Sequence, residues 1–267
     1  MKKSRLFDVL LYLVLLWAFI GFFYTPYDPQ SQAFTDDRLA GPSASHLLGI
    51  DGLGRDLFSR IWLGSGHSIG MGVLATFGNL SLAGLLLFLE QKSPGWVSRF
   101  LLSFISGWLA IPVLFIALLL LVFFDQGPKT IIVAAALGNV PFTFRQLRVL
   151  WRHQRETLYV QASRVLGSRS WNLFRKTIWP NLRPDVVGLS KLIFAFSLLE
   201  ISGLAFLGLI GDPDFAELGS IIRQNKSYLL ADYSKKGWNQ TQTSELHLAS
   251  CQESESSRFV FFRPHFA

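Results

Sequence analysis

Side chains that could do chemistry are few and scattered along this chain. Its five histidines show none of the spacings typical of metal ligands. They are His46, His67, His153, His247 and His265. The single cysteine, Cys251, allows neither an intrachain disulfide nor a cysteine-based metal site. The glycine-rich run 64–70 suggests a phosphate-binding loop, but it lacks the Lys-Ser/Thr ending and leads into an apolar segment. We therefore predict no catalytic residue, no bound cofactor, no metal site and no enzyme activity.

One carboxylate lies where water is scarce. Glu200 falls near the middle of the apolar segment 185–210. Because a charge is costly inside a bilayer, this side chain is expected to face the interior of a helix bundle or a water-filled path. Two interpretations stay open. Glu200 lines a translocation pathway, or it makes a buried hydrogen bond to Ser202 or to a neighbouring helix.

The composition indicates a membrane protein. Half of the residues are hydrophobic and only 16% are charged, which is too apolar for an ordinary soluble domain of 267 residues. Five apolar segments are each long enough to cross a bilayer as a helix. They cover roughly 6–24, 67–89, 101–124, 130–150 and 185–210. The predicted fold class is all-α, a polytopic membrane helix bundle with five spans.

The positive charge indicates an orientation. The formal charge is +7, but Lys and Arg cluster at the ends of apolar segments, which argues against a nucleic-acid partner. The basic start followed by the apolar run 6–24 lacks a small-residue cleavage site, so we expect a retained first helix. With the N-terminus in the cytoplasm, the predicted cytoplasmic segments carry fourteen Lys and Arg and the outside segments six. That bias supports a cytoplasmic N-terminus.

A basic, polar segment, 151–184, separates two of the apolar runs. Gly167 is expected to break it into two short helices. The first places four residues on one face by their spacing: Tyr159, Ala162, Ser163 and Leu166. The second carries Trp171 and Phe174 on one side and leads to Pro180. Such a segment is either a docking surface for a soluble partner or an interfacial helix pair lying on lipid headgroups.

This segment resembles the EAA loop of ABC-importer permeases, which docks on the ATPase subunit. Gln161, Ala162 and Ser163 stand where the family has Glu-Ala-Ala, Gly167 is the family's glycine, and 178–180 end the motif as Ile-Trp-Pro. Two of the three leading letters differ from the family. The resemblance favours docking over a lipid-bound helix pair.

A second stretch, 48–64, is similar to the region before the second span in C-type subunits of peptide permeases. Its matching residues are Gly49, Asp51, Gly54, Arg55, Asp56, Ser59 and Arg60. We expect an outside turn cluster followed by a short helix whose polar side holds the last four of these. That helix either only orients the following span or contacts a substrate-binding protein. A weaker similarity to the same subunits covers 206–219.

The resemblance implies a role and a set of partners. The chain would be the C-type (dipeptide-, oligopeptide- or antimicrobial-peptide-type) permease subunit of a bacterial inner-membrane peptide importer. It would pair with a second permease as a heterodimer, and with two ATPase subunits that bind the ATP. A substrate-binding protein would deliver the cargo, which the sequence does not identify. The alternative is an ATP-independent secondary transporter or exporter component, which would need several buried carboxylates, whereas only Glu200 is a candidate.

Three parts are expected along the chain. Residues 1–66 form the first span, an outside loop and an interfacial helix, and 67–232 form the permease core with the coupling loop 151–184. Residues 233–267 are polar and cannot cross a bilayer, so the family's sixth span is missing. We hypothesise that this tail is out of the family's reading frame and disordered; a functional, naturally different tail is the alternative.

Overall fold

The structure is a computed structural model that describes residues 16–21, 23–168 and 170–226. The predicted tail 233–267 and most of the predicted first span 6–24 therefore lie outside the described residues. In the described part, the regular elements are helical apart from one isolated bridge between Ile50 and Asp56. The predicted all-α fold class is confirmed for these residues.

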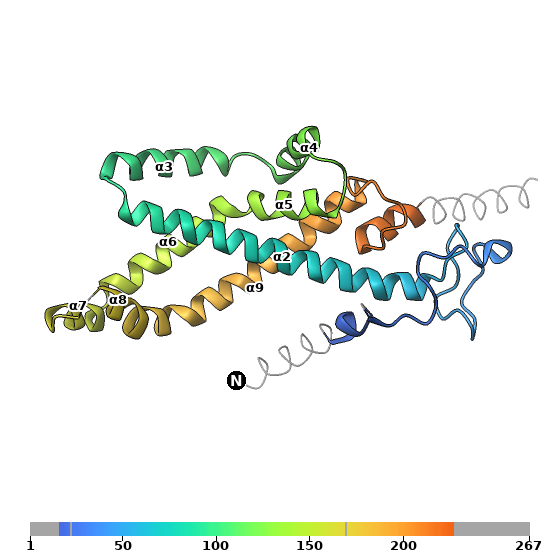
Figure 1. Cartoon of the computed structure of the whole chain (residues 1–267), viewed down its shortest axis with the longest axis horizontal. Coiled ribbons are helices and arrows are strands. Elements are labelled where there is room, and N and C mark those ends of the chain that lie inside the picture. Colours follow the sequence, from blue (N-terminus) through green and yellow to red (C-terminus); the bar gives the residue numbers. More distant parts are fainter. Residues whose placement is uncertain (1–15, 22, 169, 227–267) are drawn as a thin grey trace, which may run out of the picture. The chain divides into compact units, whose positions relative to one another are not determined.

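Ten helical elements are named in the described part (Figure 1). They are η1 (Thr35–Asp37), α2 (Leu57–Lys92), α3 (Gly95–Trp108), α4 (Val113–Phe123), α5 (Pro128–Gly138), α6 (Val140–Glu156), α7 (Leu158–Val165), α8 (Ser170–Leu173), η2 (Phe174–Ile178) and α9 (Trp179–Phe206). Helical turns also cover 16–21 and 218–226. The short helices α7 and α8 lie at one end of the bundle, and the loop 25–56 lies at the other (Figure 1).

Two long apolar helices form the frame of the bundle. They are Leu57–Lys92, which is α2, and Trp171–Phe206, which ends with α9, and each is long and apolar enough to cross a membrane. Both pack against α5 and α6. Small buried residues such as Ala75, Ala134 and Ala205 let these helices approach closely, as is usual where helices pack in a bilayer.

The predicted third span, 101–124, is not one straight helix. The structure breaks it into α3 and α4, which are bent by 95° relative to each other. Pro112 precedes α4 as its N-cap, with extended backbone. Proline lacks an N–H donor and disfavours a helical residue before it, which explains why α3 ends at Trp108. The pair is either a broken span or a re-entrant loop.

The predicted fourth span, 130–150, is interrupted at Asn139. The interruption separates α5, an apolar helix of 11 residues, from α6. Pro141 lies in the first turn of α6, where its missing N–H removes the hydrogen bond that would continue α5. The described residues thus contain two spanning helices, or three if the bent pair counts as one span.

Candidate functional site

The helix α7 is held in place at both ends by its own backbone. Thr157 has extended backbone, and its carbonyl accepts hydrogen bonds from the amides of Val160 and Gln161, which start the helix. At the other end Gly167 has a φ of +80°, and the amide of Ser168 donates to the carbonyl of Ser163 at 3.1 Å. This is the glycine-terminated helix end that the sequence predicts, so the break at Gly167 is confirmed.

A small apolar core fixes α7 against the start of α9. Val160, Leu173 and Ile178 are buried together, and Trp151 of α6 packs on them. The half-buried Phe174 adds a ring contact with Trp151, at a centroid distance of 6.0 Å. The turn η2 between α8 and α9 is π-helical and carries Phe174 and Ile178. The helix pair is therefore continuous with α9, and Pro180 occupies the first turn of that helix.

One exposed face of α7 is apolar. Leu158, Val165 and Leu166 are 82%, 88% and 84% exposed. With the exposed Ala162 they follow an i, i+4, i+7, i+8 spacing and form one stripe. We call Leu158, Ala162, Val165 and Leu166 the α7 stripe. The exposed ring of Trp171 on α8 is also apolar.

The stripe differs from the predicted face. Ala162 and Leu166 are exposed as expected, but the Tyr159 hydroxyl donates to the Gln154 side chain, and Ser163 is half-buried. Sequence reasoning missed Leu158 and Val165, although the seven-residue spacing between them was a usable signal. Gln161, which stands where the family has Glu, donates from Nε2 to the backbone carbonyl of Glu156 at 3.0 Å.

The predicted outside motif is a turn cluster built on Asp51. Its Oδ1 accepts the amides of Leu53 and Arg55, both at 2.9 Å, and its Oδ2 accepts Nε of Arg55 at 2.9 Å. Gly49 and Gly54 have φ values of +81° and +79°. These left-handed conformations suit glycine and let the loop fold back on itself.

Arg55 and Arg60 join this cluster to a distant loop. Arg55 donates to the Asp214 carboxylate at 3.0 Å. Arg60 donates to the carbonyls of Pro29 at 3.1 Å and Pro213 at 3.4 Å. Both arginines are fully buried. These hydrogen bonds hold the loops around Pro29 and Pro213 against the start of α2.

The structure corrects the expected polar helix side. Asp56 caps α2 by accepting the amide of Ser59 at 2.8 Å, and it also pairs with His46 at 2.9 Å. Asp56 and Ser59 are buried, as are Arg55 and Arg60. The spacing of polar residues in the sequence does not reveal that a loop folds over the start of a helix. The pattern therefore predicted an exposed polar side where these residues are buried. These buried side chains stabilise the loop 25–56 and the start of α2.

A carboxylate links the two long helices near the same end of the bundle. Glu217 is fully buried and accepts hydrogen bonds from Ser68 of α2 at 2.9 Å and Ser202 of α9 at 2.8 Å. It also accepts the amide of Ser220 at 3.1 Å. Three donors compensate the burial of this carboxylate and connect two spanning helices to the turn at Ser220. Nothing local in the sequence signals these distant partners.

Among the described residues, Glu200 of α9 is hydrogen-bonded neither to the α7 region nor to the Asp51 cluster. Its carboxylate accepts a hydrogen bond from the side-chain amide of Asn139 at 2.6 Å. Of the two predicted structural partners, Ser202 is excluded because it bonds to Glu217, and the neighbouring helix provides Asn139. Glu200 is half-buried. It therefore lies at the contact between α9 and the break that separates α5 from α6.

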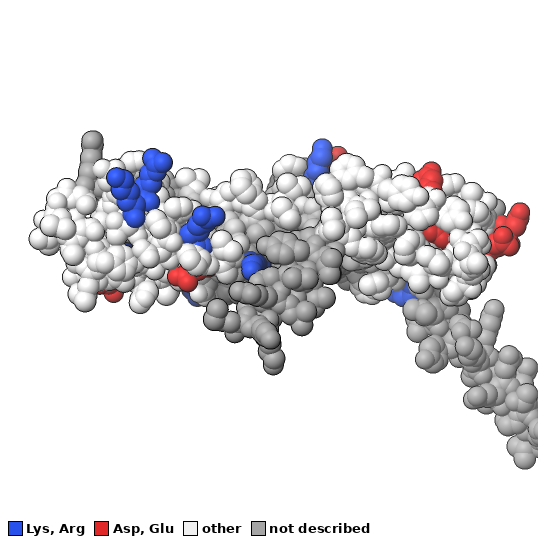
Figure 2. All heavy atoms as spheres, turned by 90° about the horizontal axis from the view of Figure 1, so that it is seen from below, with Lys and Arg blue, Asp and Glu red and all other residues white. Residues whose placement is uncertain are grey.

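Charge is distributed unevenly over the described surface. On the face seen in Figure 2, the most prominent Lys and Arg lie towards the end that carries α7 and α8, and Asp and Glu are visible at both ends. This matches the distribution in the sequence, where the segment 145–184 is rich in Arg.

Comparison with known proteins identifies the chain's family. Residues 81–233 match the model of the "Binding-protein-dependent transport system inner membrane component". The chain belongs to this family. It is therefore a multi-pass inner-membrane permease of a binding-protein-dependent ABC importer, and not an enzyme. Membership decides against the ATP-independent carrier that the sequence left as an alternative.

Individual relatives agree with this assignment. The chain is 28% identical over 225 residues to the glutathione transport system permease protein GsiD of Pectobacterium atrosepticum, covering 84% of this chain and 73% of the relative. It is 27% identical over 224 residues to the protein of that name from Shigella flexneri, with the same coverage. The family match includes α7, α8 and Glu200, so the predicted coupling loop lies inside it.

Proposed function

We propose that this permease is the C-type subunit of a peptide-class importer and that α7 and α8 form the surface on which its ATPase docks. The observation that carries the proposal is the α7 stripe, four exposed small or apolar residues on a helix whose position is fixed. A contiguous exposed apolar patch with polar surroundings is typical of an interaction site.

The geometry favours a protein partner over lipid headgroups. The helix α7 projects from the bundle on the buried Val160 and is stopped by the left-handed Gly167, so it is a short, rigid knob. A rigid knob loses little conformational entropy when a groove closes around it. Burying one exposed Leu side chain contributes about 1.5–3 kcal/mol, so Leu158 and Leu166 together would contribute about 3–6 kcal/mol to docking.

The same core offers a route for coupling. Ile178 and Leu173 connect α7 to the beginning of α9, and α9 carries Glu200. A displacement of α7 by the ATPase would therefore move α9 relative to Asn139 at the break between α5 and α6. In the proposed alternating-access cycle, this movement opens the path first to one side and then to the other, with Glu200 lining it.

Orientation and partners follow from the role. We place the N-terminus and the α7–α8 end in the cytoplasm, where the ATPases lie, because Lys and Arg are concentrated there. The proposed assembly contains a second permease, two ATPase subunits that bind the ATP, and a substrate-binding protein on the opposite side. Since the relatives are named for glutathione, a peptide, we propose a small peptide as the cargo.

Docking is tested by placing a charge on the α7 stripe. Val165→Glu should abolish co-purification of the ATPase subunits with the permease, while membrane insertion stays normal. The matched control is Leu47→Glu, which alters an exposed apolar residue of the outer loop. ATPase association that survives Val165→Glu as well as Leu47→Glu would contradict docking and favour the lipid-bound helix pair.

A further inference from the structure

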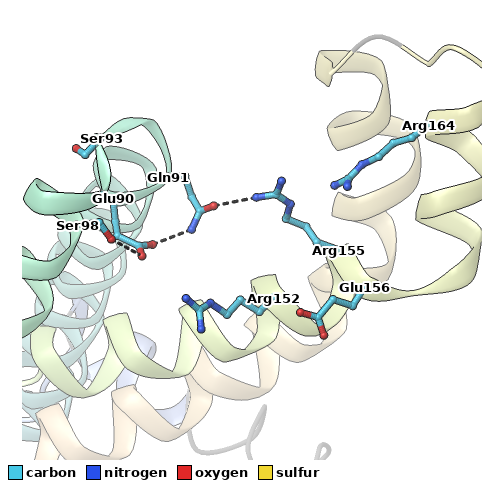
Figure 3. Close-up of a pocket in the computed structure, with 9 residues that line it drawn as sticks. Glu90, Gln91, Ser93, Ser98, Arg152, Arg155, Glu156 and Arg164 are labelled. Atoms are coloured by element: carbon cyan, nitrogen blue, oxygen red, sulfur yellow. Dashed lines mark hydrogen bonds between the residues drawn. The ribbon is translucent and has the colours of Figure 1, made fainter.

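Two cavities meet at Arg152, near the junction of α2, α3 and α6. The first, of about 470 Å³, is polar and is lined by Glu90, Gln91, Ser98, Arg152, Arg155 and Arg164 among others (Figure 3). The second, of about 380 Å³, lies between α3 and α6 and is also lined by Arg152. A basic polar chamber therefore adjoins a groove of different character.

One of the two carboxylates that line the polar cavity, Glu90, is already hydrogen-bonded within the protein. Glu90 is buried, and it accepts hydrogen bonds from Arg148 and Ser98, both at 3.1 Å, and from Gln91 at 2.7 Å. Gln91 in turn accepts a hydrogen bond from Arg155 at 3.0 Å (Figure 3). These contacts form a fixed polar wall on the α2 side of the cavity.

Positive charge in this cavity exceeds what its acids neutralise. Among the described residues, neither Arg152 nor Arg164 forms an ion pair, and Arg155 bonds only to a neutral amide and lies over the Trp151 ring. The remaining acid of the lining is Glu156, which also forms no ion pair in the described part. Three guanidinium groups thus face one free carboxylate, so the cavity favours an anion.

The second cavity has an apolar wall. Leu102 and Ile105 of α3 face Phe144 and Val149 of α6 across it. Its rim carries Arg145, which donates to Ser106 at 3.0 Å. An apolar groove with cations at its rim, next to a chamber that favours an anion, is complementary to an amphiphile rather than to a free ion.

The outer face of α3 supports a lipid neighbour. Trp96, Phe100 and Phe104 are exposed, and their spacing of four places them on one stripe. Trp96 follows Gly95, which lines the polar cavity. An exposed Trp near a helix end, followed by apolar rings, is typical of a helix that meets the headgroup region and then the acyl chains.

We propose that these two cavities bind one anionic phospholipid of the surrounding membrane. Its headgroup phosphate is held by Arg152 and Arg155, and one acyl chain lies in the groove between α3 and α6. The inference rests on the membrane location of the family and not on the ATPase-docking surface. Because Arg164 of α7 also lines the headgroup cavity, the bound lipid would connect α3 to the coupling helix.

The test measures lipid binding to the full-length permease in detergent. Phosphatidylglycerol should bind and raise the melting temperature, whereas phosphatidylcholine should do neither. Arg152→Gln should weaken phosphatidylglycerol binding about tenfold, the size expected from one lost charge-assisted hydrogen bond. The matched control is Arg183→Gln, which removes an exposed arginine of α9 that lines neither cavity. The control should bind like the wild type.

A second variant tests the groove. Val149→Glu places a carboxylate on its exposed rim and should weaken phosphatidylglycerol binding even though every arginine remains. Millimolar inorganic phosphate should not displace the lipid, because it cannot occupy the groove. Equal losses in Arg152→Gln and Arg183→Gln, unchanged binding in Val149→Glu, or full displacement by phosphate would each overturn the proposal. None of these outcomes bears on ATPase docking.

Discussion

The carboxylate of Glu200 on α9 accepts a hydrogen bond of 2.6 Å from the side-chain amide of Asn139, the residue that separates α5 from α6. The end of α5 and the acidic residue of α9 are thus in contact within the bundle. The contact lies at the break between α5 and α6, and such a break is tolerated within a membrane where it is buried in protein or lines a water-filled cavity.

Two substitutions separate charge from hydrogen bonding at this contact. Glu200→Gln keeps an oxygen that can accept from Asn139, so the protein should remain as abundant as the wild type, while peptide uptake falls severalfold. Glu200→Leu leaves the Asn139 amide without this partner, which costs about 1–3 kcal/mol. Uptake and thermal stability are measured for both. Normal uptake in the two variants would remove Glu200 from the pathway.

Gly167 provides a test of the coupling helix that depends on backbone conformation. Its φ is +80°, and a Cβ there would meet no atom within 4 Å, so the effect of a substitution is strain and not a clash within the chain. Gly167→Val should weaken ATPase association, since a β-branched residue is strained in the left-handed region. Gly167→Asn should retain association because Asn tolerates that region. Equal association for both variants would show that the Gly167 turn does not matter for docking.

The two ion pairs of Arg55 allow a buried and a partly exposed carboxylate to be compared. Arg55 bonds to the buried Asp51 and to the half-exposed Asp214. Arg55→Met removes the cation that lies 2.9 Å from the buried Asp51 carboxylate, which keeps Arg60 at 3.9 Å, and should cost up to about 3–5 kcal/mol. Asp214→Asn removes only a partly solvated partner and should cost about 0–1 kcal/mol. Melting temperatures of the purified variants measure both, and similar losses would contradict the assigned roles.

Close backbone approach near the buried Glu217 predicts a steric effect. A Cβ on Gly219 would lie 2.0 Å from the carbonyl oxygen of Ser202, which cannot move without shifting α9. Gly219→Ala should therefore destabilise the permease by at least about 1–3 kcal/mol. Gly203→Ala is the control, because a Cβ there meets nothing within 4 Å. If the two variants melt alike, the close packing of Gly219 on α9 is wrong.

Local features of the coupling loop could be predicted from the sequence. The glycine at 167 follows a helical stretch, and only short-range hydrogen bonds are needed to end a helix there, so the break was predictable. Family motifs likewise lie in continuous stretches. The apolar runs indicated helices, but Pro112 and Pro141 interrupt two of them, and proline's effect on a membrane helix depends on whether neighbouring helices satisfy the freed groups.

The burial of Arg55 and Glu217 could not be predicted from local sequence features. Arg55 reaches Asp214 across 159 positions, and Ser68 reaches Glu217 across 149. In the sequence each of these residues stands among ordinary loop or helix residues, so the arginines looked like the polar side of a surface helix. Their roles depend on which distant loop covers them, which periodicity does not encode.

We propose that the α7 stripe touches the ATPase in the assembled importer. The most direct measurement is site-specific photo-cross-linking in intact cells, with the photoreactive residue at Leu166 and, as a control, at Leu47 of the loop 25–56. We expect a cross-linked product that contains the permease and an ATPase subunit from position 166 and none from position 47. Cross-links from position 166 to lipid alone, with no ATPase product, would contradict it.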